Sequence, residues 1–462
     1  MTNWPPRPED LQRPAYRSLA EAVIRAVDAG ELRGGDRLPT HRNLAYDLGL
    51  SVQTVSRAYD ELIRRGIITG EVGRGTFVRS GRNDTKTPFL PDSRQGEIID
   101  CSMLKPVFEA VHADAMREAL AKLSVDIPAS VISSFRPSGA LRRYSETSWD
   151  WLRRCGLEPQ SQSLLLTNGN TSAMTIALMT AANPGDLVVT EELGHHTLKP
   201  LTRYLGLRIR GLTIDEEGIV PSAFAQICER EAVKALYVMP SGLNPTATNM
   251  PEDRRSELIS IARKHDVLII ENDAWGPLQA SRHRPIAAMA PERTFYFTSM
   301  TKCIMPGMRF GFLVVPETFE AATANRHLVT NWMATALMAE ISTRWIADGT
   351  AERLLQWQMK ALGERNRLAK RVLAGIPFNS SENGMHIWLP LPDEWTEDAF
   401  DAHTKLNGVA IAPGSSFVLS DTVPSKGVRI CIGAESVQAL ERGLSTISRL
   451  VRSQPEPVLL TY

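Results

Sequence analysis

The sequence predicts an α/β protein with a largely parallel central sheet, preceded by a small helical domain of helix-turn-helix type. Two observations lead to this prediction. From about residue 98 onward, five short apolar segments, "LLLTNG", "LVVTEE", "ALYVMP", "VLIIEND" and "TFYFTS", are predicted strands. Helical stretches lie between most of them, which is typical of a parallel sheet. Before them, "LPTHRNLAYDLGL" and "SVQTVSRAYDELIRRG" form two helical segments joined by a short turn at Gly49.

The composition fits a globular protein of two or three domains. Of 462 residues, 43% are hydrophobic and 23% charged, and Lys+Arg and Asp+Glu both total 52. A neutral total still permits a basic face on one domain. We find no apolar run that could span a bilayer and no apolar signal core, so we expect a cytoplasmic protein. The five scattered cysteines include no C-x-x-C pair, so we expect free thiols rather than disulfides or a metal site.

Residues 12–80 are the expected N-terminal domain, and the polar, proline-containing residues 81–97 are the expected linker. "YRSLAEAVIRAVDAG" has apolar residues at helical spacing and a glycine stop. Thr40 and Ser51 are expected to cap the next two helices. "IITGEVGRGTFV" then predicts a hairpin, because β-branched and aromatic residues flank a glycine-rich turn.

The third helix of this domain has the composition of a DNA recognition helix. Such a helix needs short polar side chains for base edges and basic groups for phosphates. The candidate DNA contacts are Arg42, Gln53, Thr54, Ser56, Arg57 and, at the hairpin tip, Arg74. The apolar residues of the third helix, Val55, Ala58, Leu62 and Ile63, are expected near its opposite face. Residues 1–80 hold 12 arginines, no lysine and 10 acidic residues, a net charge of only +2, so the case rests on pattern. The pattern alone also allows a small helical interaction domain with a solvated arginine face.

Three motifs of this domain match a known family. They are the "G-x-L-x-x-G-x-x-L-P" opening, the "V-x-x-A-Y-x-x-L-x-x-x-G" helix and the "G-x-G-T-F-V" hairpin. Together they resemble the winged helix-turn-helix of the GntR family of bacterial regulators. The resemblance implies DNA contacts at Arg42, Gln53, Thr54, Arg57 and Arg74.

A single lysine in "FTSMTKCIMPGMRFGF" is the candidate reactive group of the larger domain. A lysine amine can form a Schiff base with a carbonyl, including that of pyridoxal 5'-phosphate (PLP). Such a site also needs a carboxylate for the pyridinium nitrogen, a donor for the phenolate oxygen and a cup for the phosphate. Without that context, Lys302 would be an ordinary solvated lysine.

The required groups occur at the ends of predicted strands, where ligands bind in open α/β sheets. Asp273 ends "DVLIIEND" and suits a pyridinium, although it could also cap a helix. Asn244 precedes a proline and can donate to a phenolate oxygen, or merely form a turn. The candidate phosphate cup consists of Gly169, Asn170, Thr171, Ser172, Ser299, Thr301 and Arg309. Any of its hydroxyls could be structural.

These segments resemble the fold-type I aminotransferases, in order and spacing, over roughly residues 98–450. The matching pieces are "S-x-T-K" with Lys302, "N-P-T" with Asn244, "E-N-D" with Asp273, and "GVRICIGA", whose Arg429 matches the arginine that grips the substrate α-carboxylate. A GntR-type winged helix joined to such a domain, here residues 98–452, is the architecture of the MocR group of transcription regulators.

The match has departures in the cofactor-binding set. Trp275 stands where the family usually has a tyrosine that holds the phenolate, and an indole N–H can only donate. His195 takes the place of the aromatic that stacks on the cofactor ring, and Thr171 that of a glutamine. We expect these changes to permit PLP binding and to impair transamination, which needs tuned proton transfers. Phe135 and Arg136 match residues that border the neighbouring subunit's site.

The resemblance implies a PLP-dependent regulator that acts as a head-to-tail homodimer, and we expect it to be a repressor. An amino-compound effector would form an external aldimine by displacing Lys302, and its carboxylate would pair with Arg429. Overall similarity indicates regulation of ectoine or hydroxyectoine breakdown, but no motif singles out that pathway. Two alternatives stay open: an active aminotransferase with an accessory DNA-binding domain, and a DNA-binding protein whose large domain is a scaffold without PLP.

Overall fold

The computed structural model describes residues 4–28, 31–33, 35–65, 67–71, 75–78, 98–133, 142–279, 282–419 and 426–454. The chain divides into two compact units, Met1–Asp92 and Ser93–Tyr462, and each has its own hydrophobic core. The expected linker at 81–97 lies outside the described residues, as do Arg74, Phe135 and Arg136.

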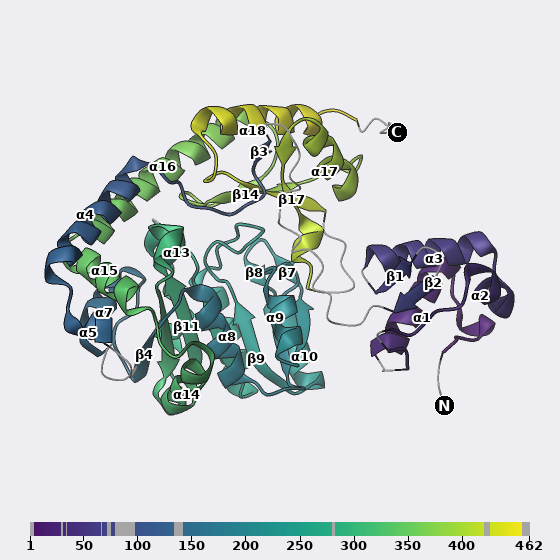
Figure 1. The fold of residues 1–462 in the computed structure, drawn as a ribbon, viewed down its shortest axis with the longest axis horizontal. Coiled ribbons are helices and arrows are strands. Elements are labelled where there is room, and N and C mark those ends of the chain that lie inside the picture. The colour runs from purple at the N-terminus through teal and green to yellow at the C-terminus, as the bar shows by residue number, and fades with distance from the viewer. Residues whose placement is uncertain are drawn as a thin grey trace. The chain divides into compact units, whose positions relative to one another are not determined.

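In its described residues, the first unit contains three α-helices and a pair of antiparallel strands (purple in Figure 1). Its elements are a short 3-10 turn at Pro8–Asp10, α1 (Ala15–Asp28), α2 (His41–Leu48), α3 (Val52–Arg64), β1 (Ile68–Glu71) and β2 (Gly75–Val78). Both predicted caps are confirmed: Thr40 accepts a hydrogen bond from the Asn43 amide at 3.3 Å, and Ser51 accepts one from the Thr54 amide at 3.0 Å. Gly49 ends α2 with φ 62°, a left-handed conformation that glycine adopts without strain.

The core of this unit is built from the apolar faces of all three helices. Leu19 of α1, Leu44 of α2, and Val55 and Leu62 of α3 are fully buried. The sequence pattern had placed Ile63 on the same face of α3, and this was wrong, because Ile63 is 42% exposed. One step along a helix turns a side chain by about 100°, which carries Ile63 away from the stripe that contains Leu62.

The second unit is built on a seven-stranded sheet in the order β4-β12-β11-β10-β9-β5-β6. Its strands are β4 (Gln162–Thr167), β5 (Leu187–Glu191), β6 (Arg208–Leu212), β9 (Val233–Val238), β10 (Leu268–Asn272), β11 (Thr294–Ser299) and β12 (Gly311–Pro316). Only β12 runs against its neighbours, so the predicted largely parallel sheet is confirmed. Five of these strands were predicted; β6 and β12 were not. β6 alternates exposed arginines with partly buried residues, so it lacks the apolar run that marked the others.

Helices cover both faces of this sheet. They are α7 (Ser145–Arg154), α8 (Asn170–Ala181), α9 (Leu198–Tyr204), α10 (Pro221–Arg230), α11 (Glu252–Lys264), α12 (Ile286–Met289), α14 (Glu320–Asn331) and α15 (Ala336–Ala347). On β11, Phe295 and Phe297 pack in one cluster with Ile176 of α8, whereas Tyr296 packs on the other side with Trp151 of α7. Burial on both faces explains why the central strands are almost entirely apolar.

A C-terminal lobe carries a second, antiparallel sheet in the order β13-β14-β17-β16. Its elements are β13 (Asn379–Ser380), β14 (His386–Pro390), α17 (Glu397–Leu406), β15 (Val409–Ala410), β16 (Ala412–Pro413), β17 (Gly427–Cys431) and α18 (Val437–Val451). β15 pairs with β3 (Ile99–Asp100), and a small hairpin joins β7 (Ile214–Asp215) to β8 (Gly218–Ile219). In Figure 1, α16 (Thr350–Val372) runs beside α4 (Ala110–Asp126) and leads up to this lobe, while α5 (Ala129–Ser133) follows α4.

Alternation along β14 and β17 gives this lobe two different faces. Ile387 and Ile430 point into the lobe's own core. His386, Arg429 and Cys431 occupy the alternate positions and therefore lie on the opposite face. No helix within the described residues is both long and apolar enough to cross a membrane.

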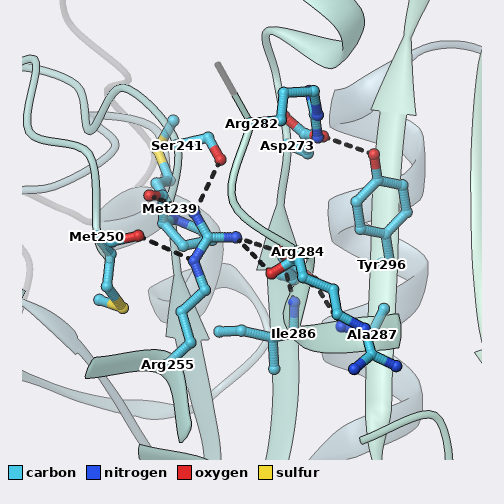
Figure 2. Close-up of polar contacts among 12 residues, drawn as sticks. Met239, Ser241, Met250, Arg255, Asp273, Arg282, Arg284, Ile286, Ala287 and Tyr296 are labelled. Carbon is cyan, nitrogen blue, oxygen red and sulfur yellow. Dashed lines mark hydrogen bonds and ion pairs between the residues drawn. The ribbon is translucent and has the colours of Figure 1, made fainter. Parts of the chain in front are cut away.

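A buried arginine ties the loop after β9 to the underlying structure, as Figure 2 shows. Arg255 of α11 is 1% exposed and donates to the carbonyls of Pro240 and Met250, each at 3.0 Å. It donates also to the carbonyl of Arg284 at 3.0 Å and to the Ser241 hydroxyl at 3.2 Å. These bonds fix both ends of the loop from 240 to 250.

The counter-charge of Arg255 is Glu271 on β10, 4.0 Å away and 1% exposed. Glu271 accepts hydrogen bonds from the amides of Ile286 and Ala287 at 3.2 and 2.8 Å. Burial raises the pKa of Glu271 to about 7, and the Arg255 charge opposes that rise. Loss of either partner would therefore leave the other as a buried charge without a counter-charge.

Arg255→Met is expected to lower the free energy of unfolding by about 3–5 kcal/mol, because it leaves Glu271 buried without a counter-charge and several carbonyls without donors. Arg263→Met is the matched control, because its pair with Glu292 is about half exposed and should contribute about 1 kcal/mol or less. Equilibrium urea denaturation of the two variants tests this. Equal losses in both would contradict the role given to Arg255.

Candidate functional site

The candidate site lies at the edge of the large sheet where its parallel strands end. The segments after β4, β5, β9, β10 and β11 carry, in that order, Gly169, His195, Asn244, Asp273 and Lys302. Because carboxyl ends of parallel strands meet at one edge, five segments distant in sequence contribute to one place. The α-carboxylate candidate, Arg429, reaches the same place from the C-terminal lobe, since it contacts Asn244.

Lys302 lies on α13 (Met300–Cys303), a single helical turn that directly follows β11. Its amine donates to the Leu104 carbonyl at 2.5 Å. Burial lowers the pKa of Lys302 to about 8, and the charges of Arg429 and Arg309 act in the same direction. A large fraction of this amine is thus neutral in mildly alkaline solution, which is the form that attacks a carbonyl.

Asp273 follows β10 and is 1% exposed. Its Oδ2 accepts from Arg282 Nη2 at 2.5 Å and from the Tyr296 hydroxyl at 2.6 Å, and both partners are visible in Figure 2. Its Oδ1 is buried, and no described residue bonds to it. One carboxylate oxygen is therefore fixed by the protein while the other has unused capacity for a donor.

Gly169, Thr301 and Arg309 converge at the N-terminus of α8. A Cβ built on Gly169, which has φ 82°, would lie 3.4 Å from the guanidinium carbon of Arg309 and 3.6 Å from Thr301 Oγ1. Hydroxyls of Ser172, Ser299 and Thr301, together with Asn170 Oδ1, are buried with no partner among the described residues. Thr171 is exposed on the first turn of α8. A helix N-terminus with unused donors and an arginine is suited to a phosphate.

Asn244 and Arg429 form a second polar pair in the site, and both are 2% exposed. Arg429 Nη1 donates to Asn244 Oδ1 at 2.9 Å, which turns the Asn244 amide nitrogen the other way and leaves it as a donor. Arg429 Nη2 donates to the Ser102 carbonyl at 2.6 Å, and its guanidinium lies 4.7 Å from the centre of the Phe417 ring. Arg429 Nε is buried and unpartnered within the described part of the chain.

In the first unit, α3 presents the predicted polar face. Gln53 and Arg57 are exposed, Thr54 and Ser56 are partly exposed, and Arg42 of α2 is exposed as well. The Arg57 guanidinium lies 4.7 Å from the ring centre of Tyr16, a cation–π contact that limits its movement. Arg74 falls outside the described residues, so its predicted place in a wing is untested.

Comparison with known proteins identifies both parts of the chain. Residues 113–447 match the family described as aminotransferase class I and II, and residues 15–78 match the family described as bacterial regulatory proteins, gntR family. The chain belongs to the class I and II aminotransferase family. Its N-terminal domain is of the GntR helix-turn-helix type, so it is a transcription regulator of the MocR kind with a PLP-dependent, aminotransferase-like domain.

The chain is also similar over most of its length to curated regulators. It is 25% identical to the uncharacterized HTH-type transcriptional regulator YdeF of Bacillus subtilis over 453 residues, 97% of both chains. It is 26% identical over 371 residues to the pyridoxine biosynthesis transcriptional regulator PdxR of Corynebacterium glutamicum, 78% of this chain and 79% of PdxR. The probable rhizopine catabolism regulatory protein MocR of Rhizobium meliloti is 24% identical over 425 residues, 82% of both.

Among solved structures, a kynurenine aminotransferase of Pyrococcus horikoshii shares the fold. The TM-score is 0.71 at 21% identity, over 77% of this chain and 91% of that chain. This confirms the predicted fold-type I architecture. The cofactor implied by the family is PLP.

The unused polar atoms of the site fit PLP in kind and in position. The free Oδ1 of Asp273 suits a protonated ring nitrogen, the amide nitrogen of Asn244 suits a phenolate oxygen, and the cup at Gly169 suits a phosphate. Lys302 supplies the amine. These are four different chemical requirements, met at one sheet edge.

Two departures from the family pattern have a physical consequence here. Trp275 donates its indole N–H to the Gly242 carbonyl at 2.6 Å, so this group holds the loop after β9 and is not available to a phenolate oxygen. His195 stacks on His196 with 4.9 Å between ring centres, and burial lowers the pKa of His195 to about 3, with help from His196 and Lys302. The His195 imidazole is therefore neutral.

Sequence reasoning missed several groups of this site. Tyr296 lay within a predicted strand, where alternation could have placed its hydroxyl on the face opposite Phe295. No pattern marked Arg282, nine residues after Asp273, or the carbonyls of Ser102 and Leu104.

The rate at which the apoprotein takes up PLP should follow the titration of Lys302. With a pKa of about 8 the neutral fraction of the amine grows as pH rises and then saturates, whereas an ordinary lysine would keep gaining about tenfold for each unit up to about pH 10. Stopped-flow absorbance at a series of pH values measures this, with Lys302→Ala as the blank. A rate that still climbs tenfold per unit above about pH 9 would contradict the lowered pKa.

Proposed function

We propose that this regulator senses an amino-acid-like metabolite with PLP held on Lys302, and that occupancy of this site controls its binding to operator DNA. The main support is that Lys302, a buried acid and a buried arginine from another lobe share one site, in a chain that also carries a recognition helix. The regulator is proposed to act as a repressor.

Within this proposal, each group of the site has one task. Asp273 holds the ring nitrogen, Asn244 donates to the phenolate oxygen, and the groups around Gly169 bind the phosphate. PLP supplies an aldehyde that forms a Schiff base with a primary amine. Arg429 then binds the effector's carboxylate, since its planar guanidinium matches a carboxylate in two-point geometry.

Binding of the effector would rearrange the bonds that Arg429 now makes. Its Nη2 bonds to the Ser102 carbonyl, and Ser102 belongs to the segment that leads back toward the N-terminal domain. A carboxylate at Arg429 competes with that carbonyl, so the effector favours an arrangement in which this segment is held differently. Such a differential affinity is what an effector needs in order to change DNA binding.

The regulator is further proposed to be a head-to-tail homodimer, because two recognition helices then read two spaced half-sites of an operator. Ectoine or hydroxyectoine catabolism is proposed as the regulated pathway. None of the site residues specifies that pathway, so amino compounds from it belong in any screen beside common amino acids.

An active aminotransferase is the alternative function. All groups for the first half of a transamination are present, but the Trp275 N–H is committed to Gly242. An assay for turnover of an amino acid with a keto acid separates the two functions. Slow residual turnover would agree with sensing, whereas turnover at the rate of a metabolic enzyme, about 10 per second, would favour the alternative.

Lys302→Ala should bind operator DNA as the wild type does but should not respond to effector. The purified wild type should show a visible Schiff-base band that borohydride removes, and the variant should lack it, because its side chain has no amine. Absorption spectra and electrophoretic mobility shifts with and without amino compounds measure both effects. Lys105→Ala is the matched control, because it removes an exposed lysine from the same unit.

A wild type that stays colourless with added PLP would refute the cofactor assignment. If the wild type is coloured and the DNA binding of Lys302→Ala responds to effector as strongly as that of the wild type, sensing through this lysine is refuted. The two outcomes concern different steps of the proposal and can be told apart in one set of samples.

Arg57→Gln should weaken operator binding by about 1–3 kcal/mol. Arg57 is exposed on the polar face of α3, and its guanidinium is already positioned by Tyr16. Fluorescence anisotropy at several salt concentrations measures the effect and shows whether a phosphate contact was lost. Arg25→Gln, the same change on α1, is the control and should bind normally; equal losses in both variants would remove α3 from the DNA contact.

A further inference from the structure

The bonding of Asp273 is asymmetric in a way that bears on cofactor chemistry. Arg282 and Tyr296 both bond to Oδ2, at 2.5 and 2.6 Å, while Oδ1 has no partner among the described residues. Arg282 also donates to the Gly276 carbonyl, which fixes its guanidinium beside the carboxylate. In Figure 2, Tyr296 lies to the right of Asp273, and the end of the Arg282 side chain lies against the Asp273 carboxylate.

The charge of Arg282 is permanent. Burial by itself lowers its pKa, but the charge of Asp273 outweighs this and raises the pKa above that of a free arginine. Tyr296 stays protonated, because burial and then the Asp273 charge raise its pKa well above the ordinary value. Asp273 therefore has one cationic and one neutral donor on the same oxygen.

The other titratable groups near Asp273 leave this pairing undisturbed. The thiols of Cys155 and Cys303 are buried, and burial raises the pKa of each, so both are neutral. The two other charged side chains, Arg255 and Glu271, form an ion pair with each other. Arg282 is thus the cation that bonds to Asp273, within the part of the chain described by the structure.

A carboxylate favours protonation of a ring nitrogen placed against it, and a nearby cation opposes that protonation. Each effect weakens as the distance between the charge and the ring nitrogen grows, because Coulomb energy falls with separation. A nitrogen bonded to Oδ1 would contact the carboxylate directly, whereas the guanidinium lies behind it on Oδ2. The cation therefore cancels part of the carboxylate's effect and not all of it.

We propose that Arg282 partly cancels the charge of Asp273, so that a ring nitrogen bonded to Oδ1 keeps its proton less firmly than it would beside an unpaired carboxylate. A protonated ring nitrogen gives PLP its strength as an electron sink, which loss of the effector's α-proton requires. Arg282 thereby favours binding of the amine over its conversion. This inference rests on the proposed function, since it presumes PLP at Lys302.

The test is the protonation state of the bound ring nitrogen, read by nitrogen NMR of protein loaded with PLP that carries ¹⁵N in the ring. The ¹⁵N shift is followed as pH is raised. In Arg282→Met the nitrogen should stay protonated to higher pH than in the wild type, with a midpoint higher by about one unit or more. Exchange of the effector's α-proton with deuterated solvent should become faster in the same variant.

Two further variants separate charge from structure. Arg282→Lys keeps the charge and should titrate close to the wild type. Tyr296→Phe removes a neutral donor from the same oxygen, so its midpoint should rise by less than that of Arg282→Met. If Arg282→Met loses the cofactor, Arg282→Gln, which keeps a neutral donor, carries the same expectation.

Equal midpoints in the wild type and in the neutral variant that retains PLP would overturn the inference and leave Arg282 a purely structural residue. That result would leave the proposed function intact. A wild type that takes up no labelled PLP gives no bound signal, and this outcome would instead overturn the proposed function.

Discussion

The geometry of the site depends on the buried charge of Arg255. This side chain holds the carbonyls of Pro240 and Met250, which are the two ends of the loop that carries Asn244. Its counter-charge, Glu271, lies two residues before Asp273 on the neighbouring strand. One ion pair beneath the sheet edge therefore links Asn244, the proposed donor to the phenolate oxygen, to Asp273, the proposed partner of the ring nitrogen. Because a buried charge without its partner is costly, breaking this link would destabilise both segments.

Topology explains how much of the site could be predicted from the sequence. Once the strands were read as parallel, their carboxyl ends had to meet, so Lys302, Asp273 and Asn244 could be grouped without knowing any distance. Runs of apolar residues predicted five of the buried strands, and capping residues predicted where two helices of the first unit begin. Arg282 could not be found in this way, because it lies in a short polar segment with neither strand nor helix periodicity, and only the folded chain brings it to Asp273.

The predicted role of Trp275 shows the other limit of sequence reasoning. Its residue type indicated a donor, and its position in the motif placed that donor near the cofactor. The structure directs the N–H to the Gly242 carbonyl instead. Gly242 has φ 62°, and a Cβ there would lie 2.8 Å from the indole nitrogen, so the loop can approach the ring this closely only with glycine. A motif gives the residue that stands at a site, but the backbone around it decides which partner its hydrogen bond reaches.

A sensor and a transaminase require different chemical properties from the same residues. Both need a neutral amine at Lys302 and an arginine at position 429 that can bind a carboxylate. The desolvation of Lys302 and the burial of Arg429 serve either purpose. Only the transaminase needs the ring nitrogen to be strongly protonated, because only it removes the α-proton. A sensor instead needs its ligand to remain intact, so that occupancy follows concentration and can shift the equilibrium between two DNA-binding arrangements. An arginine bonded to Oδ2 of Asp273 weakens the hold of the ring nitrogen on its proton, and Oδ1 still accepts a hydrogen bond from that nitrogen while the proton is in place.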